Sequence, residues 1–435
     1  MMKKTIAYIV LYGSAVGCVE TFTIPPEVLE VVPILVVEAT VTDSLQRQKV
    51  ILSRTDELDS IVNIGSRFEP SLNAPFASAQ RRAIRYERDA TVMVIDRSNN
   101  EYLFVEEEPG KYYSQEAFAA EQGMAYQLQV TTANGEMYRS EYEEVRGKSQ
   151  IDALYADRIT SDLGQEGMAI YVDSSDLLKE TDYFRYEYEE TYKIIAPNWT
   201  AFEFKILNDG SVPGEVPAVE LVPRQQEERV CYNTEASSDI KLLNTNSLQN
   251  PVSTRNLVRF IDRSNPIISH RYSILVRQYT TSLEAYNYYD NLRRFSGTEN
   301  VFSNVQPGFL EGNLSSANGN LIIGYFDVAS IEEKRLYFNY EDFFPGEPLP
   351  PYFTDINCER AISPPLGDPE RDGPPSPFGP CPEPLIPRIK TQRIEFFGFT
   401  GNPPEVCQGP YLVTPTVCGD CTTLGSNQVP DFWIE

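Results

Sequence analysis

Alternating apolar and polar residues dominate the first third of the chain. The runs ILVVEATV (34–41) and KVILSRT (49–55) are typical of strands. The alternating run YQLQV is followed by Asn134-Gly135, a pair that tolerates the positive φ of a tight hairpin turn. Several short strands separated by turn signals predict a β-sandwich over residues 33–148, of immunoglobulin-like or transthyretin-like type.

The middle of the chain continues this pattern and adds a helix. In YFRYEYEETY the aromatic residues share one face and charged residues the other, which indicates a half-buried antiparallel strand; the aromatic face is Phe184, Tyr186, Tyr188 and Tyr192. The stretch from Thr281 to Glu284 fits a capping box at the start of a helix. Residues 149–343 therefore predict a second, larger β-rich domain with one or two helices.

The pattern changes again near residue 344. Residues 344–387 hold 14 of the 32 prolines and few apolar residues, so this segment cannot build a core alone. Cysteines within it indicate a fixed geometry rather than a flexible linker. Residues 344–435 are expected to form a proline- and cysteine-rich tail packed on the second domain. The predicted fold class is mainly β.

Composition narrows the function. The 435-residue chain is long enough for two cores, and its 26 tyrosines and 22 phenylalanines favour strands. Asp and Glu outnumber Lys and Arg by 63 to 37, a formal net charge of −26. Such a chain would be repelled by nucleic acid, so we expect no nucleic-acid partner.

The N-terminus predicts the compartment. The opening MMKKTIAYIVLYGSAVGC combines two lysines, an apolar run too short to span a bilayer, and small residues leading into Cys18. This resembles a bacterial lipobox, in which cleavage precedes a cysteine that is then acylated. We therefore expect residues 1–17 to be a lipoprotein signal peptide, Cys18 to carry the lipid and residues 18–32 to be a tether to the membrane.

Six cysteines remain for other roles: Cys231, Cys358, Cys381, Cys407, Cys418 and Cys421. An even number in an exported chain predicts disulfides, with 15 possible connectivities that the sequence does not distinguish. The Cys418-Gly-Asp-Cys421 spacing also fits half a zinc site or a redox pair, which are the alternatives. We expect three disulfides that staple the tail, with Cys231 the one partner from the second domain, and Phe432-Trp433 packed as an apolar plug beside Cys418 and Cys421.

Motifs for catalysis are missing from the sequence. The single histidine, His270, precedes a strand with no nucleophile motif nearby, so a structural role is expected. Asp368 to Gly373 departs from the calcium-loop pattern, and we predict no metal, cofactor or catalytic residue. Paired carboxylates of a glycosidase type stay an alternative, because acidic residues are abundant.

Longer stretches carry a family resemblance. They are Val-Glu after Cys18, ILVVEATVTD with KVILSRT, GKYYS, CYNTEASSDI, RYSILVRQYTTSLEAYNYYDNL, IIGYFDVASIEEKR and the closing CGDCTTLGSNQVPDFW. In this order they resemble the Bacteroidota lipoprotein family known as domain of unknown function 4249. Family members commonly have Lys where this chain has Val429.

The resemblance implies a location and a partner. Family members resemble outer-membrane lipoproteins, often encoded beside TonB-dependent receptors, and no catalytic residues are known for them. We therefore expect a non-enzymatic accessory subunit that faces the cell surface and captures a ligand for, or gates, a TonB-dependent transporter. A structural or assembly subunit of an outer-membrane complex is the alternative, and a carboxylate-based hydrolase a weaker one.

Two further sets of residues are candidates for contacts and modification. Tyr286, Tyr288 and Tyr289 of the predicted helix could meet a partner, although core packing is the commoner role for any one of them. Asp43-Ser44-Leu45 and Asp59-Ser60-Ile61 resemble O-glycosylation sites of exported Bacteroidota proteins, so Ser44 and Ser60 are possible modification sites. Plain turn residues are the alternative for both.

Overall fold

The computed structural model describes ten stretches of the chain: residues 33–55, 84–148, 150–175, 182–212, 215–246, 252–296, 310–353, 357–367, 381–401 and 407–435. Strands make up most of the regular structure, which confirms the mainly-β prediction. No described helix is long and apolar enough to cross a membrane. The predicted signal peptide 1–17, Cys18, the tether 18–32, Ser60 and Asp368–Asp372 lie outside the described residues.

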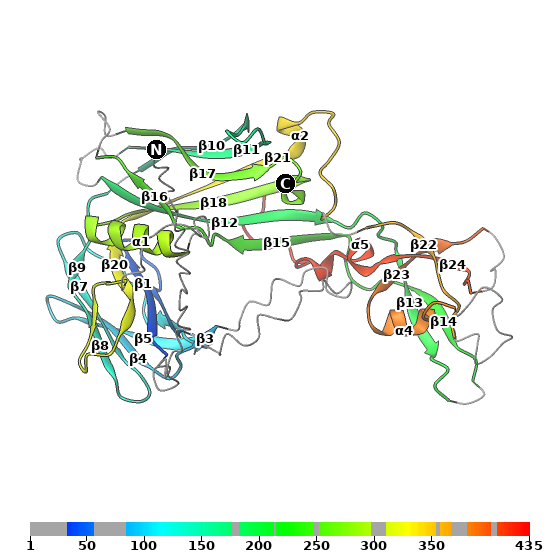
Figure 1. The fold of residues 1–435 in the computed structure, drawn as a ribbon, viewed down its shortest axis with the longest axis horizontal. Coiled ribbons are helices and arrows are strands. Elements are labelled where there is room, and N and C mark those ends of the chain that lie inside the picture. Colours follow the sequence, from blue (N-terminus) through cyan, green and yellow to red (C-terminus); the bar gives the residue numbers. More distant parts are fainter. Residues whose placement is uncertain are drawn as a thin grey trace, which may run out of the picture.

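Eleven strands form the first sheet, on the left in Figure 1. They are β1 (Leu35–Thr42), β2 (Lys49–Arg54), β3 (Arg85–Tyr86), β4 (Thr91–Asp96), β5 (Glu101–Glu108), β6 (Lys111–Ser114), β7 (Ala125–Thr131), β8 (Met137–Ser140), β9 (Glu143–Glu144), β19 (Leu314–Ser316) and β20 (Ile322–Ala329). The order is β19-β8-β7-β4-β5-β6-β2-β1-β20, with β3 beside β2 and β9 beside β7. β1 and β20 pair in parallel. Two strands of this sheet, β19 and β20, come from residues 149–343, the range predicted for the second domain. Domain boundaries drawn in chain order therefore miss the pairing of β19 with β8 and of β20 with β1.

The two ends of the first sheet meet at Asn313. Its side-chain amide donates to the carbonyl of Phe326 at 2.9 Å and accepts from the Phe326 N–H at 2.8 Å, so it replaces one rung of a strand ladder. A Cβ on Gly312 would lie 1.7 Å from the carbonyl oxygen of Gly324, so the two backbones can approach this closely only because residue 312 is a glycine. The sheet is thereby rolled around one apolar core that includes Leu52, Leu128 and Phe326.

A second sandwich packs two sheets face to face. The smaller sheet has the order β10 (Gln150–Thr160), β11 (Glu166–Ser175), β17 (Val252–Asp262). The larger has the order β15 (Val230–Ala236), β12 (Tyr183–Ile195), β18 (Arg271–Thr280), β21 (Ile331–Asn339), with β16 (Lys241–Asn244) also paired to β12. The predicted aromatic face of β12 is confirmed, because Phe184, Tyr186, Tyr188 and Tyr192 are all buried in the core between the sheets.

One carboxylate shares this aromatic face. Glu190 is buried and accepts hydrogen bonds from the Tyr272 hydroxyl at 2.5 Å and from Arg259 Nε at 2.9 Å. Arg259 comes from the smaller sheet and Tyr272 from the larger one. Glu190 therefore links the two sheets through bonded partners, which a buried charge requires.

Helix α1 (Leu283–Ser296) lies beside β12 and β20, between the first sheet and the second sandwich (Figure 1). The helix is confirmed, but its predicted capping box was placed one residue early. The N-cap is Ser282, whose Oγ accepts from the N–H of Ala285 at 3.0 Å. Thr281 is instead tied into the sheets, because its N–H donates to the carbonyl of Tyr183 at 3.0 Å.

The other helices in the described residues are short: η3 (Pro266–Ile268), α2 (Tyr340–Phe343), α4 (Leu385–Lys390), α5 (Thr416–Gly419) and η4 (Cys421–Thr423). At the right of Figure 1 a small lobe projects from the second sandwich. This distal lobe contains the hairpin β13 (Phe202–Asn208) and β14 (Ala218–Pro223), the sheet β22 (Ala361–Ile362), β24 (Tyr411–Pro415), β23 (Ile394–Phe399), and α4.

Candidate functional site

Three disulfides staple the tail, and one of them joins it to β15 of the second sandwich. The pairs are Cys231–Cys421, Cys358–Cys418 and Cys381–Cys407. Cys418 and Cys421 form disulfides with different partners. The Cys-x-x-Cys spacing, which also fitted half a zinc site or a redox pair, therefore belongs to two separate disulfides. Cys231 is the partner from β15, as the sequence predicted.

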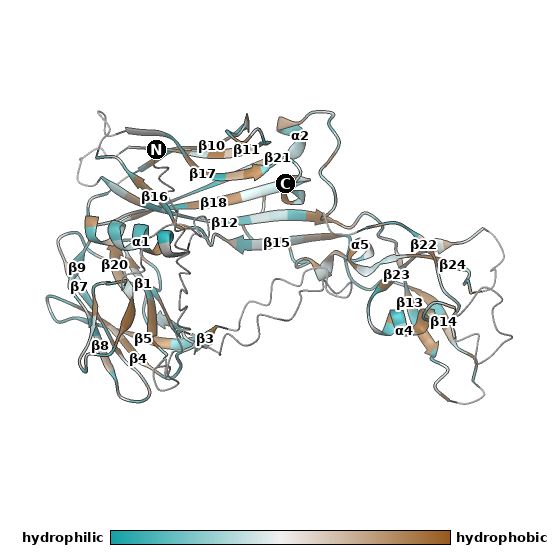
Figure 2. Ribbon diagram, in the orientation of Figure 1, coloured by the Kyte–Doolittle hydropathy of each residue, from teal (hydrophilic) through white to brown (hydrophobic). Residues whose placement is uncertain are grey.

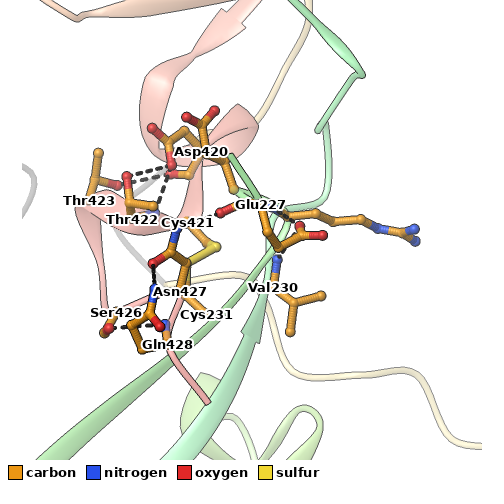
Figure 3. Close-up of a disulfide and its surroundings, with 12 residues drawn as sticks. Glu227, Val230, Cys231, Asp420, Cys421, Thr422, Thr423, Ser426, Asn427 and Gln428 are labelled. Atoms are coloured by element: carbon orange, nitrogen blue, oxygen red, sulfur yellow. Dashed lines mark hydrogen bonds between the residues drawn. A yellow bond between two sulfur atoms is a disulfide. The ribbon is translucent and has the colours of Figure 1, made fainter. Parts of the chain in front are cut away.

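The residues around Cys421 hold its backbone in place (Figure 3). The Asp420 carboxylate accepts from the Thr422 N–H at 2.8 Å and from the Thr422 hydroxyl at 2.7 Å, which caps the turn η4. The Cys421 N–H donates to the carbonyl of Glu228 at 2.9 Å, just before β15. In the chain-entropy treatment, closing loops with separations of 190, 60 and 26 residues stabilises by about 5, 4 and 3.5 kcal/mol respectively.

Polar contacts also fix the distal lobe. The Arg224 guanidinium, almost fully buried, pairs with Glu228 and with Glu395 Oε2, the latter at 2.9 Å. Asn198 Nδ2 donates to the carbonyl of Cys358 at 2.7 Å and to Thr414 Oγ1 at 2.9 Å. The hairpin, the tail sheet and a disulfide are therefore joined by buried bonds, which makes the lobe a rigid extension of the second sandwich.

Apolar side chains remain exposed on this lobe. Phe399 is 64% exposed and Val216 is 78% exposed. In Figure 2 much of the β14 ribbon is brown, and the apolar residues of this strand are half-buried. The set, here called the lobe apolar residues, is Phe202, Leu207, Val212, Val216, Ile362 and Phe399. All six lie on this one projecting lobe, and exposed apolar residues that adjoin one another are typical of a protein contact surface.

The predicted contact tyrosines lie mostly inward. Tyr288 is buried and its ring centroid lies 5.4 Å from that of Tyr325 on β20. Tyr289 is partly buried beneath the Arg185 guanidinium, and Tyr286 packs against Tyr183 with ring centroids 5.1 Å apart. These contacts attach α1 to both sandwiches. Contact with a partner stays a prediction for all three.

A buried charge cluster lies where α1 meets the two sandwiches. Arg185 on β12 is 6% exposed and its guanidinium stacks on Tyr279 at 4.4 Å and on Tyr289 at 4.7 Å from the ring centroids. It pairs with Glu187 and donates to Thr40 Oγ1 of β1 at 3.3 Å. The nearby Asp327 on β20 is buried, and this burial raises its pKa to about 6, although the positive charge of Arg185 opposes the shift.

Other contacts close the same junction. Asp43 accepts from the Ser330 hydroxyl at 2.7 Å and from the Ile331 N–H at 2.9 Å, where the chain passes from β20 to β21. Glu143 of β9 accepts from the Tyr325 hydroxyl at 2.8 Å, and burial raises the pKa of Glu143. No feature of the sequence pattern singled out Arg185 or Asp327, because their burial depends on strands from both sandwiches.

The position predicted for Phe432-Trp433 is corrected. Phe432 lies under the Arg335 guanidinium, 3.6 Å from the ring centroid, and the Trp433 ring packs against Tyr232 and Tyr337. Since successive residues of a strand point to opposite faces, Tyr232 lies on the face of β15 away from its neighbour Cys231. The aromatic plug therefore covers the outer face of the larger sheet rather than the disulfides.

The other candidates are separate from these regions. His270 lies between η3 and β18, and burial together with the nearby Lys193 charge lowers its pKa. Ser44 is exposed in the turn after β1 and is accessible to modification, which stays a prediction. Within the described stretches, no group of three or more His, Cys, Asp or Glu residues could hold a metal ion.

Comparisons with known proteins give a family. No curated protein matches the chain. Among solved structures, the chain is similar to a DUF4785 family protein from Legionella pneumophila, with 8% identity and a TM-score of 0.17. That match covers 56% of this chain and spans about half, 52%, of the Legionella chain. A family described as a domain of unknown function matches residues 20–335, from before β1 into β21 but not the disulfide-clasped tail. Over most of its length, therefore, the chain belongs to the DUF4249 family.

Proposed function

We propose that this protein is a Bacteroidota outer-membrane lipoprotein, anchored through Cys18, that serves a TonB-dependent transporter as a non-enzymatic accessory subunit. It would capture a ligand for the transporter or gate it, facing the cell surface. The lipobox-like N-terminus and the family resemblance support the location and the partner.

One structural observation carries the proposal: the distal lobe is held rigid by disulfides and buried ion pairs while it exposes the lobe apolar residues. A rigid contact surface loses little conformational entropy when it binds, so stapling a lobe favours recognition. Apolar side chains such as Phe399 would lose contact with water in a complex, which is the main favourable term in association. The lobe is therefore the surface that we assign to the transporter.

Purification from membranes tests this role. The tagged full-length chain would be expressed in its own host, extracted with mild detergent and purified, and its companions identified. A TonB-dependent barrel should be recovered in near-equal amount. The double substitution Leu207→Asp with Phe399→Asp should lower this recovery by about tenfold or more, because it places two charges in the contact.

The matched control is Leu163→Asp, an exposed leucine in the turn between β10 and β11, which should leave recovery unchanged. Substitution of Cys18 should release the protein from the membrane fraction. Protease added to intact cells should digest the protein if it faces the surface. A monomer that hydrolyses glycans or esters without a partner would contradict the accessory role.

A further inference from the structure

A shallow cavity of about 360 Å³, open to solvent, lies between the second sandwich and the proline-rich segment that follows α2. One side is formed by Glu166 at the start of β11 and by Asp262, Arg263 and Ser264 at the end of β17. The opposite side is formed by Tyr340 and by residues 348–351, with the sequence Pro-Leu-Pro-Pro. The volume is that of a site for a small molecule.

The proline side is held in a fixed position. Tyr340 is buried, its hydroxyl donates to the carbonyl of Pro348 at 3.0 Å, and its ring stacks on Phe344 with centroids 4.7 Å apart. Phe344 is itself covered by the guanidinium of Arg158, 4.4 Å from its ring centroid. Prolines have a restricted φ, so the segment presents a preformed surface.

The side-chain hydrogen-bond donors of the cavity already have partners. Arg263 pairs with Glu166 at 3.0 Å and with Glu347. The Ser264 N–H donates to Asp262 Oδ1 at 2.8 Å, and the Ser264 hydroxyl donates to the same oxygen. The three prolines have no N–H to offer.

Acceptors, by contrast, remain available. Both bonds from Ser264 reach Oδ1 of Asp262, and in the described part of the chain no hydrogen bond reaches its Oδ2. Prolines contribute carbonyl oxygens without donors. A ligand of this cavity must therefore bring the hydrogen-bond donors itself.

The charge and the apolar surface of the cavity further restrict the chemical class of its ligand. Glu166, Asp262 and Glu347 outnumber Arg158 and Arg263 by one, within a chain of net charge −26. Leu349 is 54% exposed, and its neighbours contribute apolar pyrrolidine rings. We propose that this cavity binds a small organic cation: a primary amine attached to an apolar ring or chain, with the ammonium at Asp262 and the apolar part against the proline segment.

Benzylamine is a suitable probe, with benzyl alcohol and benzoate as neutral and anionic probes of the same shape. Binding to the full chain would be measured by ligand-observed NMR titration at neutral pH and physiological salt. Benzylamine should bind at least about tenfold more tightly than either of the other two, because only it supplies a charged donor.

Two substitutions then locate the site. Asp262→Asn removes the charge and should weaken benzylamine binding by about fivefold or more, and Leu349→Ser, on an exposed residue that the fold tolerates, should weaken it to a similar degree. Asp239→Asn is the control, since Asp239 is an exposed acid paired only with Lys241 among its described contacts. It should leave binding unchanged.

Three results would overturn the assignment. They are equal binding of benzoate, unchanged binding by both cavity variants, or the same loss with Asp239→Asn, which would indicate attraction by net charge alone. None of these bears on recovery of a transporter, so this site and the accessory role fail independently.

Discussion

The first sheet and the distal lobe are stabilised in different ways. The first sheet rolls around a continuous apolar core in which Leu52, Leu128 and Phe326 are fully buried, and its described residues include no disulfide. The distal lobe has small sheets that bury only a few apolar residues, among them Phe396 and Val413, and leave others such as Phe399 exposed. Two of the three disulfides lie within it or at its base. Small elements cannot bury much apolar area alone, and covalent links therefore supplement the small core of the lobe.

This difference has a functional meaning. A core that buries its apolar residues leaves few of them for a partner, whereas a stapled lobe can keep them exposed and still hold its shape. The lobe is therefore suited to contact and the first sheet to support.

The largest effect is expected from the Cys231–Cys421 link. Replacing both cysteines by alanine should lower the stability of the tail by about 5 kcal/mol, because the link closes the longest loop. The only two tryptophans, Trp199 and Trp433, lie beside the tail and within it, so their fluorescence follows this region. The denaturation midpoint followed by fluorescence should fall, and an unchanged midpoint would contradict the clasp.

Phe326→Ala changes the other side of the comparison. This fully buried side chain of β20 should cost about 4 kcal/mol when truncated, through lost burial and the cavity left behind. Hydrogen exchange of the β1 and β2 amides should accelerate, while the tryptophan transition stays in place. Leu163→Ala, on an exposed leucine, is the control and should change neither signal.

Asp327 gives the junction a pH dependence. Its folded-state pKa of about 6 lies above the unfolded value of 3.8, so the folded state holds the proton more tightly. The carboxyl therefore lowers stability as pH rises from about 4 to 6, by up to about 3 kcal/mol above that window. Asp327→Asn should remove this decrease when unfolding is measured at pH 4, 5, 6 and 7. If the stability of both proteins changed with pH in the same way, Asp327 would not be the group responsible.

Asn313→Ala tests how the first sheet closes. The two hydrogen bonds from the Asn313 side chain to the backbone of Phe326 would be lost, and the Phe326 N–H would have no acceptor in their place. The free energy of unfolding should fall by about 2 kcal/mol. Hydrogen exchange should accelerate more at the amides of β19 and β20 than at those of β4 and β7. Equal acceleration across the whole sheet would mean that Asn313 does not close it.

Local patterns predicted much of this structure because alternation is a local property. The aromatic face of β12, the helix after residue 282 and the disulfide role of six cysteines could all be predicted. The parallel pairing of β1 with β20 could not, since it joins residues far apart in the chain. Arg185 lies on the polar face of β12 yet is buried, because that face meets α1 and the first sheet.

The distal lobe also has features that the sequence alone could not predict. Its cysteines indicated a clasp, but the choice among 15 connectivities depends on which backbones lie close in space. The exposure of Phe399 and Val216 is also a property of the assembled lobe, since strands of this composition are equally common in cores.

Hydrogen exchange before and after reduction of the disulfides tests the comparison most directly. Reduction at neutral pH should abolish protection in β13, β14, β22, β23 and β24 while β1, β2, β4, β7 and β20 keep theirs, because, of these two regions, only the lobe contains disulfides among its described residues. Unchanged protection in the lobe, or equal loss in the first sheet, would contradict the account.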